Sequence, residues 1–342
     1  MLEYIYLDSN AFWVMKPKHP SVDDDFRETV ARLHEDYRFP FSEAHFVDIA
    51  ASDKPGNEHN VKYDLNFLGY VSRGNCVSLS LETRKPPEEL YPTVGPIPGK
   101  DWIIHPHFDD VAAAYREMDK SDPQELQANL FTNLFRDFYG EKKVAVEIAD
   151  VPKEHPLLDF LKVANGLLSA EVLQDYMADF WMHRNDPLPY KHFRQWVVDA
   201  LNKSAEKNAI LGPDRANKIA DLTKFFSART VDDITDTLVN AANVLCLIRG
   251  EVLDDLSWPQ KLVTAYNLLS FHPERWDKIN KDNRPSNMMC DSKHLVYAAG
   301  AAHFVTADKR FAAKATVTFS AFGIGTEISD LADFKAKFSG NN

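Results

Sequence analysis

Cysteine is scarce in this sequence, and so is any long apolar run. Its 342 residues include three cysteines, which lie far apart without a CxxC spacing: Cys76, Cys246 and Cys290. This pattern argues against a disulfide framework or a thiolate metal site, and it is typical of a reducing compartment, so we expect a cytoplasmic protein. No run of about 18 apolar residues occurs, and the first ten residues contain no basic side chain. We therefore expect neither a membrane span nor a signal peptide.

Positive charge is also in deficit, because the formal net charge at pH 7 is −12. A protein that coats nucleic acid broadly would be basic, and this composition does not match one. Residues 181–230 differ from the rest of the chain, with nine Lys or Arg against five Asp or Glu. This segment is either a solvated helix face or a groove for nucleic acid. If it is a groove, the candidate substrate-binding residues are Arg184, Lys191 and Arg194.

The first fifty residues alternate between strand and helix patterns. The apolar run LEYIYL ends at Asp8 and predicts a buried strand. A helix capped at Ser21 is expected next, followed by a short, weak strand in RFPFS, where Pro40 limits the pairing. A second helix is expected in SEAHFVDIAAS, with Ser42 as its cap.

The last fifty residues repeat this alternation. We expect a helix over 291–302, a strand in HFVTAD, another helix, a short strand in TEIS and a closing helix capped at Ser329. Strands that alternate with helices predict an α/β fold, in which a central, mainly parallel sheet lies between helices in three α/β/α layers.

The middle of the chain has a different pattern. A hairpin is expected near CVSLSLE, a Pro- and Gly-rich loop follows, and helical patterns then dominate. The simplest organisation is a discontinuous α/β domain formed by residues 1–55 and 285–342. Residues 56–284 would then form a large, mostly α-helical insertion.

Four aspartates fall at informative places in this pattern. Asp8 and Asp308 each end an apolar strand, and Asp291 opens the helix before the second of these strands. Asp48 lies six residues after Ser42 and could face the same edge of the sheet. Ligands of open α/β sheets gather beyond the carboxyl ends of the strands. Clustered carboxylates repel one another, and oxygen ligands suit Mg²⁺ or Mn²⁺, so a site for one or two such ions is predicted.

Each aspartate also has an ordinary structural interpretation. Asp8 could end a strand in a turn, Asp291 could cap a helix, and Asp308 could open a turn. Asp48 could be a solvated helix residue. His45 and His294 could likewise be packed helix residues, and the cap interpretation of Ser42 stays open beside a functional one.

Four segments resemble the PIN-domain nucleases. LDSN is similar to the first-strand motif of that family, and SEAHFVDIA is similar to its segment in which Ser follows the second strand. DSKHLVYAAGAAHFVTADKRF resembles its segment of Asp, alanine-rich helix, apolar strand and Thr-x-Asp, and GIGTEISDLADF resembles its closing strand and helix. The resemblance covers the two ends of the chain, and it implies a PIN-like domain whose catalytic and metal-binding residues are Asp8, Asp48, Asp291 and Asp308.

The resemblance implies an endoribonuclease that hydrolyses RNA phosphodiester bonds with Mg²⁺ or Mn²⁺. A structure-specific DNA nuclease and an inactive PIN-like module that binds RNA or protein are the alternatives. Residues expected to support the metal ligands are Asn10, Ser42, His45, His294 and Thr306. The sequence departs from the family at Asp48, where Glu is usual, and Glu43 is a rival for that place. The insertion has no counterpart in the family, and the sequence leaves a protein partner or a homo-oligomer open.

Overall fold

A computed structural model of the chain describes residues 3–17, 19–79, 102–105, 111–117, 144–145, 147–150, 157–168, 172, 213–248, 252–275 and 285–339. The chain forms two compact units. The first comprises Met1–Lys120, Ser257–Asn267 and Met289–Asn342, and the second comprises Ser121–Leu256 and Leu268–Met288.

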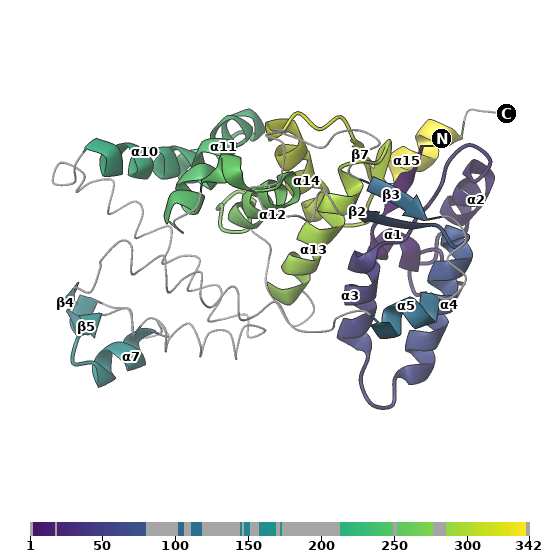
Figure 1. The fold of residues 1–342 in the computed structure, drawn as a ribbon, viewed down its shortest axis with the longest axis horizontal. Coiled ribbons are helices and arrows are strands. Elements are labelled where there is room, and N and C mark those ends of the chain that lie inside the picture. Colours follow the sequence, from purple (N-terminus) through teal and green to yellow (C-terminus); the bar gives the residue numbers. More distant parts are fainter. Residues whose placement is uncertain are drawn as a thin grey trace. The chain divides into compact units, whose positions relative to one another are not determined.

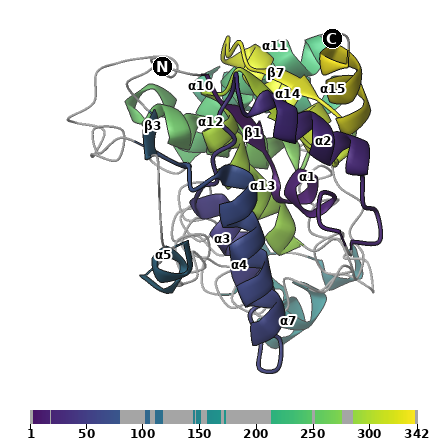
Figure 2. The ribbon, with the colours of Figure 1, turned by 90° about the vertical axis from the view of Figure 1, so that its right-hand side faces the viewer.

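A three-stranded parallel sheet lies in the first unit, in the order β1 (Ile5–Leu7), β6 (His303–Val305) and β7 (Glu327–Ser329). β1 runs beside α13, where Tyr6 meets His294 (Figure 2). The helices that contribute to this unit are α1 (Ser9–Trp13), α2 (Asp24–Leu33), α3 (Glu43–Ser52), α4 (Glu58–Ser72), α5 (Val111–Glu117), α12 (Trp258–Leu269), α13 (Pro285–Ala298), α14 (Lys309–Ala321) and α15 (Leu331–Phe338).

Residues 38–41 continue the hydrogen bonding of the sheet on the other side of β1. Isolated parallel bridges join Arg38 to Tyr4 and Phe41 to Cys76. Cys76 begins β2 (Cys76–Leu79), which pairs antiparallel with β3 (Trp102–His105). The weak strand expected in RFPFS is thus reduced to two bridges, because Pro40 between them has no N–H to donate.

Helices cover both faces of the sheet, and every residue of β1 and β6 is buried. Successive side chains of a strand point to opposite faces. Ile5 and Leu7 accordingly pack in one core with α2, α4 and α15, whereas Tyr6 and Phe304 pack in a second core with α12, α13 and α14. α2 and α15 lie side by side (Figure 1), and Lys335 of α15 is paired with Asp23. The expected α/β class with a mainly parallel sheet is confirmed.

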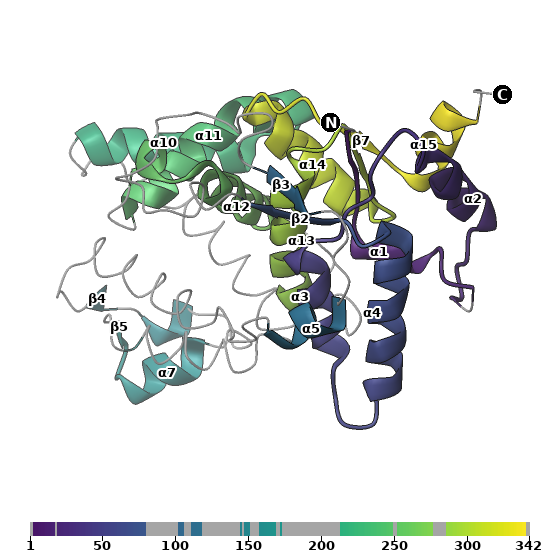
Figure 3. The ribbon, with the colours of Figure 1, turned by 45° about the vertical axis from the view of Figure 1, so that its right-hand side comes forward.

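The first unit is larger than the discontinuous domain 1–55 and 285–342 expected from the sequence. Val61, Leu65 and Leu68 of α4 are buried in the same core as β1, and Leu262 and Tyr266 of α12 are buried in the core on the other face. α3, α4 and α5 lie side by side (Figure 3). Apolar faces of α4 and α12 therefore attach residues of the expected insertion to the sheet.

Several helices begin at other residues than the sequence pattern indicates. The N-cap of α2 is Asp23 rather than Ser21, and the N-cap of α15 is Asp330 rather than Ser329. Asp291 does not open its helix, because α13 begins at Pro285, a residue type favoured at the first helical position. The cap at Ser42 is confirmed, since its hydroxyl accepts from Ala44 N.

The described elements of the second unit are mostly helical. They are β4 (Val144–Ala145), the 3₁₀ turn Ile148–Asp150, α7 (Leu157–Val163), β5 (Leu167–Leu168), α10 (Pro213–Ser227), α11 (Val231–Ile248) and the 3₁₀ turn Leu253–Asp255. α10 packs against α11. Two of the helical sequence patterns in the middle of the chain, over 123–140 and 190–206, lie outside the described residues, as do Arg184, Lys191 and Arg194. Within the described ranges, none of the helices has both the length and the apolar character that a membrane crossing requires.

Gly300 provides a test of the packing between α13 and the β2–β3 pair. A Cβ atom at this position would lie 2.6 Å from Trp102 Cε2, and the Trp102 ring is itself packed on Trp258 at a centroid distance of 4.9 Å. We predict that Gly300→Ala destabilises the protein by about 1–3 kcal/mol through overpacking. Thermal unfolding followed by near-ultraviolet circular dichroism measures this. Gly325→Ala is the control, because a Cβ there meets no atom within 4 Å, and an equal loss in both variants would contradict the packing seen at Trp102.

Candidate functional site

Asp8 and Asp308 lie at the same edge of the sheet. β1 and β6 are parallel neighbours with Leu7 opposite Val305, and Asp8 directly follows β1. The Thr306 hydroxyl donates to Asp8 Oδ2 at 2.5 Å and accepts from the Asp308 N–H at 3.0 Å. Thr306 thus connects the two aspartates, and both follow the carboxyl ends of their strands, where ligands of α/β sheets bind.

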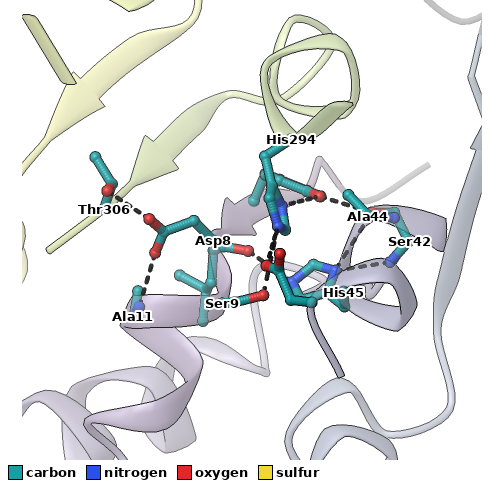
Figure 4. Close-up of polar contacts among 11 residues, drawn as sticks. Asp8, Ser9, Ala11, Ser42, Ala44, His45, His294 and Thr306 are labelled. Atoms are coloured by element: carbon teal, nitrogen blue, oxygen red, sulfur yellow. Dashed lines mark hydrogen bonds and ion pairs between the residues drawn. The ribbon is translucent and has the colours of Figure 1, made fainter. Parts of the chain in front are cut away.

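Asp8 is a buried carboxyl group. It caps α1, since its Oδ1 accepts from Ala11 N at 2.7 Å, and Figure 4 shows it between Ala11 and Thr306. Asp8 is only 2% exposed. Burial raises its pKa from the ordinary value of 3.8 to about 6, although the hydrogen bonds from Thr306 and Ala11 oppose this shift. The ionised form of Asp8 is therefore held at an energetic cost that a nearby cation would reduce.

Asp48 of α3 is paired with His294 of α13, whose Nε2 lies 2.8 Å from Asp48 Oδ2. Burial acts against the charge of both groups. The hydrogen bond and the opposite charges nevertheless lower the pKa of Asp48 below its ordinary value of 3.8 and raise the pKa of His294 above its ordinary value of 6.5. Asp48 is thus ionised, and His294 is an imidazolium over a wider pH range than an ordinary histidine.

A hydrogen-bonded chain of buried side chains fixes the His294 ring (Figure 4). His294 Nδ1 lies 2.8 Å from the Tyr6 hydroxyl, which lies 2.6 Å from Ser42 Oγ. The Ser42 N–H donates to His45 Nδ1 at 3.1 Å, so His45 Nε2 carries the proton that it donates to Leu7 O at 3.0 Å. Burial lowers the pKa of His45 to about 3, and this histidine is therefore neutral. Of the two histidines of the site, only His294 supplies positive charge.

Three of the four aspartates act on His294. The charges of Asp48, Asp8 and Asp291 all raise the pKa of His294 against the effect of burial. Asp291 itself accepts a hydrogen bond from the Tyr266 hydroxyl at 3.3 Å. The carboxylates of Asp8, which follows β1, of Asp48 on α3 and of Asp291 on α13 are therefore near enough to His294 to favour its charged form.

The remaining expected residues occupy more peripheral positions. Asp308 Oδ1 caps α14 by accepting from Arg310 N and Phe311 N. Asn10 is exposed on α1. Glu43, the alternative to Asp48, is exposed, and its Oε1 lies 3.7 Å from Lys293 Nζ. Of these two acids of α3, Asp48 is the one that is hydrogen-bonded to His294.

Four residues that the sequence did not indicate also belong to this cluster. Tyr6 and Ser9 contact His294, Tyr266 contacts Asp291, and Cys290 is partly buried near Asp48 and Asp291, so that burial and then their charges raise the pKa of its thiol. A tyrosine within a buried strand pattern was a usable signal, because a buried hydroxyl needs a partner. The sequence around the tyrosine does not identify that hydrogen-bond partner.

The donor set suits a hard divalent cation, but it is not already arranged as a metal site. Among the described residues, no group of three or more His, Cys, Asp or Glu side chains has the spacing to hold a metal ion. Asp8, Asp48 and Asp291 are instead bonded to protein donors. Each ionised carboxylate retains lone pairs beyond those bonds, and carboxylate oxygen is the donor that Mg²⁺ and Mn²⁺ prefer. The residues present therefore fit such an ion chemically.

Comparison of the chain with protein-family models, with curated proteins and with solved structures gave no match. A functional proposal therefore rests on the arrangement of these side chains together with the sequence resemblance.

The His294–Asp48 pair predicts a defined pH dependence of stability. The contribution of His294 is present below its ordinary pKa and is lost as the pH rises through its raised pKa, whereas that of Asp48 is lost as the pH falls through its lowered pKa. His294→Gln should destabilise the protein by about 1–3 kcal/mol near pH 6, and by less near pH 9. Urea unfolding across this range measures the effect, with exposed His59→Gln as the control. A loss that does not vary with pH would show that His294 only fills space.

The burial of Asp8 predicts a second pH dependence of stability. A carboxyl whose pKa is higher in the folded protein binds its proton more tightly there, so stability falls as the pH rises from about 4 to above 6. With a folded pKa of about 6, the loss is up to about 3 kcal/mol, since each pKa unit is worth about 1.4 kcal/mol. Asp8→Asn should remove this loss. The stability of the variant relative to wild type should therefore increase between pH 4.5 and 7.5, as measured by unfolding experiments with EDTA.

Asp23→Asn is the matched control for Asp8→Asn. Asp23 also caps a helix, by accepting from Phe26 N. Burial by itself would raise its pKa, but the hydrogen bonds from Lys335 and Phe26 N and the charge of Lys335 together lower it. Because the pKa of Asp23 is lowered below 3.8, its stabilising contribution is already fully present at these pH values, so Asp23→Asn should be less stable than wild type by a nearly constant amount between pH 4.5 and 7.5. If both variants show the same trend, the burial of Asp8 does not govern its ionisation.

Proposed function

We propose that this chain is a Mg²⁺- or Mn²⁺-dependent nuclease with a PIN-like catalytic domain and that RNA is its substrate. The observation that carries the proposal is the placement of Asp8 and Asp308 after neighbouring parallel strands, joined through Thr306, together with the Asp48–His294 pair. Buried carboxylates that outnumber the nearby protein cations make further positive charge favourable.

The chain's own residues would hold and orient the carboxylates. Asp8 is fixed by Ala11 N and the Thr306 hydroxyl, and Asp48 is fixed by His294. When bound, a divalent ion supplies the Lewis acidity that lowers the pKa of a water and stabilises the leaving oxygen of a phosphodiester. His294 is oriented in turn by Tyr6, an arrangement in which residues behind the ligands set their direction.

RNA is preferred to DNA on the sequence resemblance alone. A structure-specific DNA nuclease would use the same acids, and an inactive module would keep the fold without cleavage. Arg184, Lys191 and Arg194 remain the candidate residues for binding substrate phosphates. The sequence basis for that assignment is the local excess of basic residues in 181–230.

Cleavage of mixed single-stranded and structured RNA and DNA tests the proposal. Wild type should cleave RNA with Mn²⁺ or Mg²⁺ and not with EDTA. Asp8→Asn, Asp48→Asn and Asp291→Asn should each slow cleavage by about 100-fold or more, because losing a ligand costs at least as much as losing a residue that orients one.

The chain offers matched controls for two of the acids. Asp308→Asn is compared with Asp23→Asn, since both aspartates cap a helix and Asp23 does not follow a strand of the sheet. Asp48→Asn is compared with Glu43→Gln on the same helix. Cleavage that resists EDTA would overturn the metal-dependent mechanism. Cleavage of DNA alone would favour the DNA nuclease, and RNA binding without cleavage would favour the inactive module.

A further inference from the structure

Asp291 is contacted by a tyrosine from a distant part of the first unit. Tyr266 lies on α12, and its hydroxyl donates to Asp291 Oδ2 at 3.3 Å. The Tyr266 side chain is fully buried, whereas Asp291 is half-buried in the middle of α13. The hydroxyl therefore reaches the carboxylate from the interior of the protein and leaves the outer side of Asp291 accessible.

The Tyr266 ring is held from two directions. Phe311 of α14 packs edge-on against it at a centroid distance of 5.7 Å, and Lys314 Nζ lies 4.6 Å from the ring centroid. Lys314 is only 1% exposed, so its ammonium acts on the ring with little screening by water. A cation over the face of a phenol withdraws electron density from it, which makes the O–H a stronger hydrogen-bond donor.

The four acids differ in how their side chains are oriented. Asp8 and Asp308 are oriented by backbone N–H groups of the helices that they cap. Asp48 is oriented by His294, across two helices. Asp291 lies within a helix, where several side-chain rotamers are open to it and the cap mechanism does not apply. The Tyr266 bond favours the rotamers that bring Asp291 Oδ2 to the hydroxyl.

We propose that Tyr266 is a positioning residue that orients Asp291 for binding a divalent cation, with the buried charge of Lys314 strengthening its hydroxyl as a donor. The inference rests on the proposed function. It gives α12, which the sequence assigned to the insertion, a direct part in the site.

Tyr266→Phe is the decisive variant, because it removes the hydroxyl and keeps the ring that packs on Phe311. The matched control is Tyr4→Phe, which removes another buried hydroxyl, one bonded at 2.7 Å to the carbonyl oxygen of Tyr297. Titration calorimetry with Mn²⁺ alone should show affinity about tenfold weaker in Tyr266→Phe, and unchanged in Tyr4→Phe. In cleavage assays the same variant should need more Mn²⁺ for half-maximal rate, while the KM for RNA stays constant.

A second measurement needs neither metal nor activity. In protein labelled with ¹³C at the aspartate carboxyl carbon, the Asp291 resonance, assigned with Asp291→Asn, should shift at pH 7.5 in Tyr266→Phe and not in Tyr4→Phe. Lys314→Met should shift the same resonance by a smaller amount. In Tyr266→Phe, the further change Lys314→Met should shift the Asp291 resonance little, because the effect of Lys314 is transmitted through the Tyr266 hydroxyl.

The outcomes separate this inference from the proposed function. If wild type binds no Mn²⁺, the nuclease proposal fails and the ¹³C shift alone decides whether Tyr266 orients Asp291. If wild type binds Mn²⁺ and Tyr266→Phe binds it equally well, the positioning role is overturned and the nuclease proposal stands. An Asp291 resonance that is the same in wild type and in Tyr266→Phe would overturn the hydrogen bond itself.

Discussion

The ion pair between His294 and Asp48 is the interaction on which the rest of this sheet edge depends. Carboxylates brought together in a buried place repel one another and lose hydration, and both effects favour the protonated form. Asp8 shows that cost, because burial raises its pKa to about 6 although two donors bond it. The imidazolium of His294 offsets the same penalty at Asp48, whose pKa is lowered. One internal cation therefore offsets part of the negative charge of the acids around it.

The orientation of that cation depends on the three residues of β1 and the one that follows. Tyr6 points to the α13 face of the sheet and bonds His294, while the carbonyl of Leu7 accepts from His45. Asp8 then begins the turn into α1. Burial on both faces leaves β1 one register, because a slip of one residue would exchange Tyr6 and Leu7 between the two cores. The packing of the strand and the geometry of the site are therefore set together.

The sequence predicted the features that depend on local pattern. The α/β class and the cap at Ser42 follow from periodicity and capping chemistry, and the structure agrees with both. The predicted start of α13 at Asp291 was wrong, because the helix already begins at Pro285. The partners of Tyr6 and Tyr266 were not predictable. Tyr6 meets a residue 288 positions away, and periodicity tells which face a side chain occupies but not what it touches there.

The attachment of α4 and α12 to the sheet was missed for the same reason. Their apolar faces are visible in the sequence, but an apolar face packs equally well in a separate helical domain or on a sheet. The choice is made by complementary surfaces, such as Leu65 beside β1 in one core and Tyr266 beside Phe311 in the other. A division of the chain by pattern alone therefore placed the boundary at residue 55, before α4.

The sequence left each aspartate open as an ordinary cap or as part of a site, and at Asp8 these interpretations prove compatible. Asp8 and Asp23 both cap a helix through one carboxyl oxygen and both experience burial. Their pKa values nevertheless move in opposite directions. Burial is much deeper at Asp8, and Asp23 also accepts from the ammonium of Lys335 at 2.7 Å, whereas the donors bonded to Asp8 are a backbone N–H and a hydroxyl. Capping alone does not explain why a carboxyl should be buried deeply with neutral donors, since a cap works equally well at the surface. The environment of Asp8 would become like that of Asp23 if a further cation approached it, and the carboxylates of Asp48 and Asp291 lie close enough to act on the same His294.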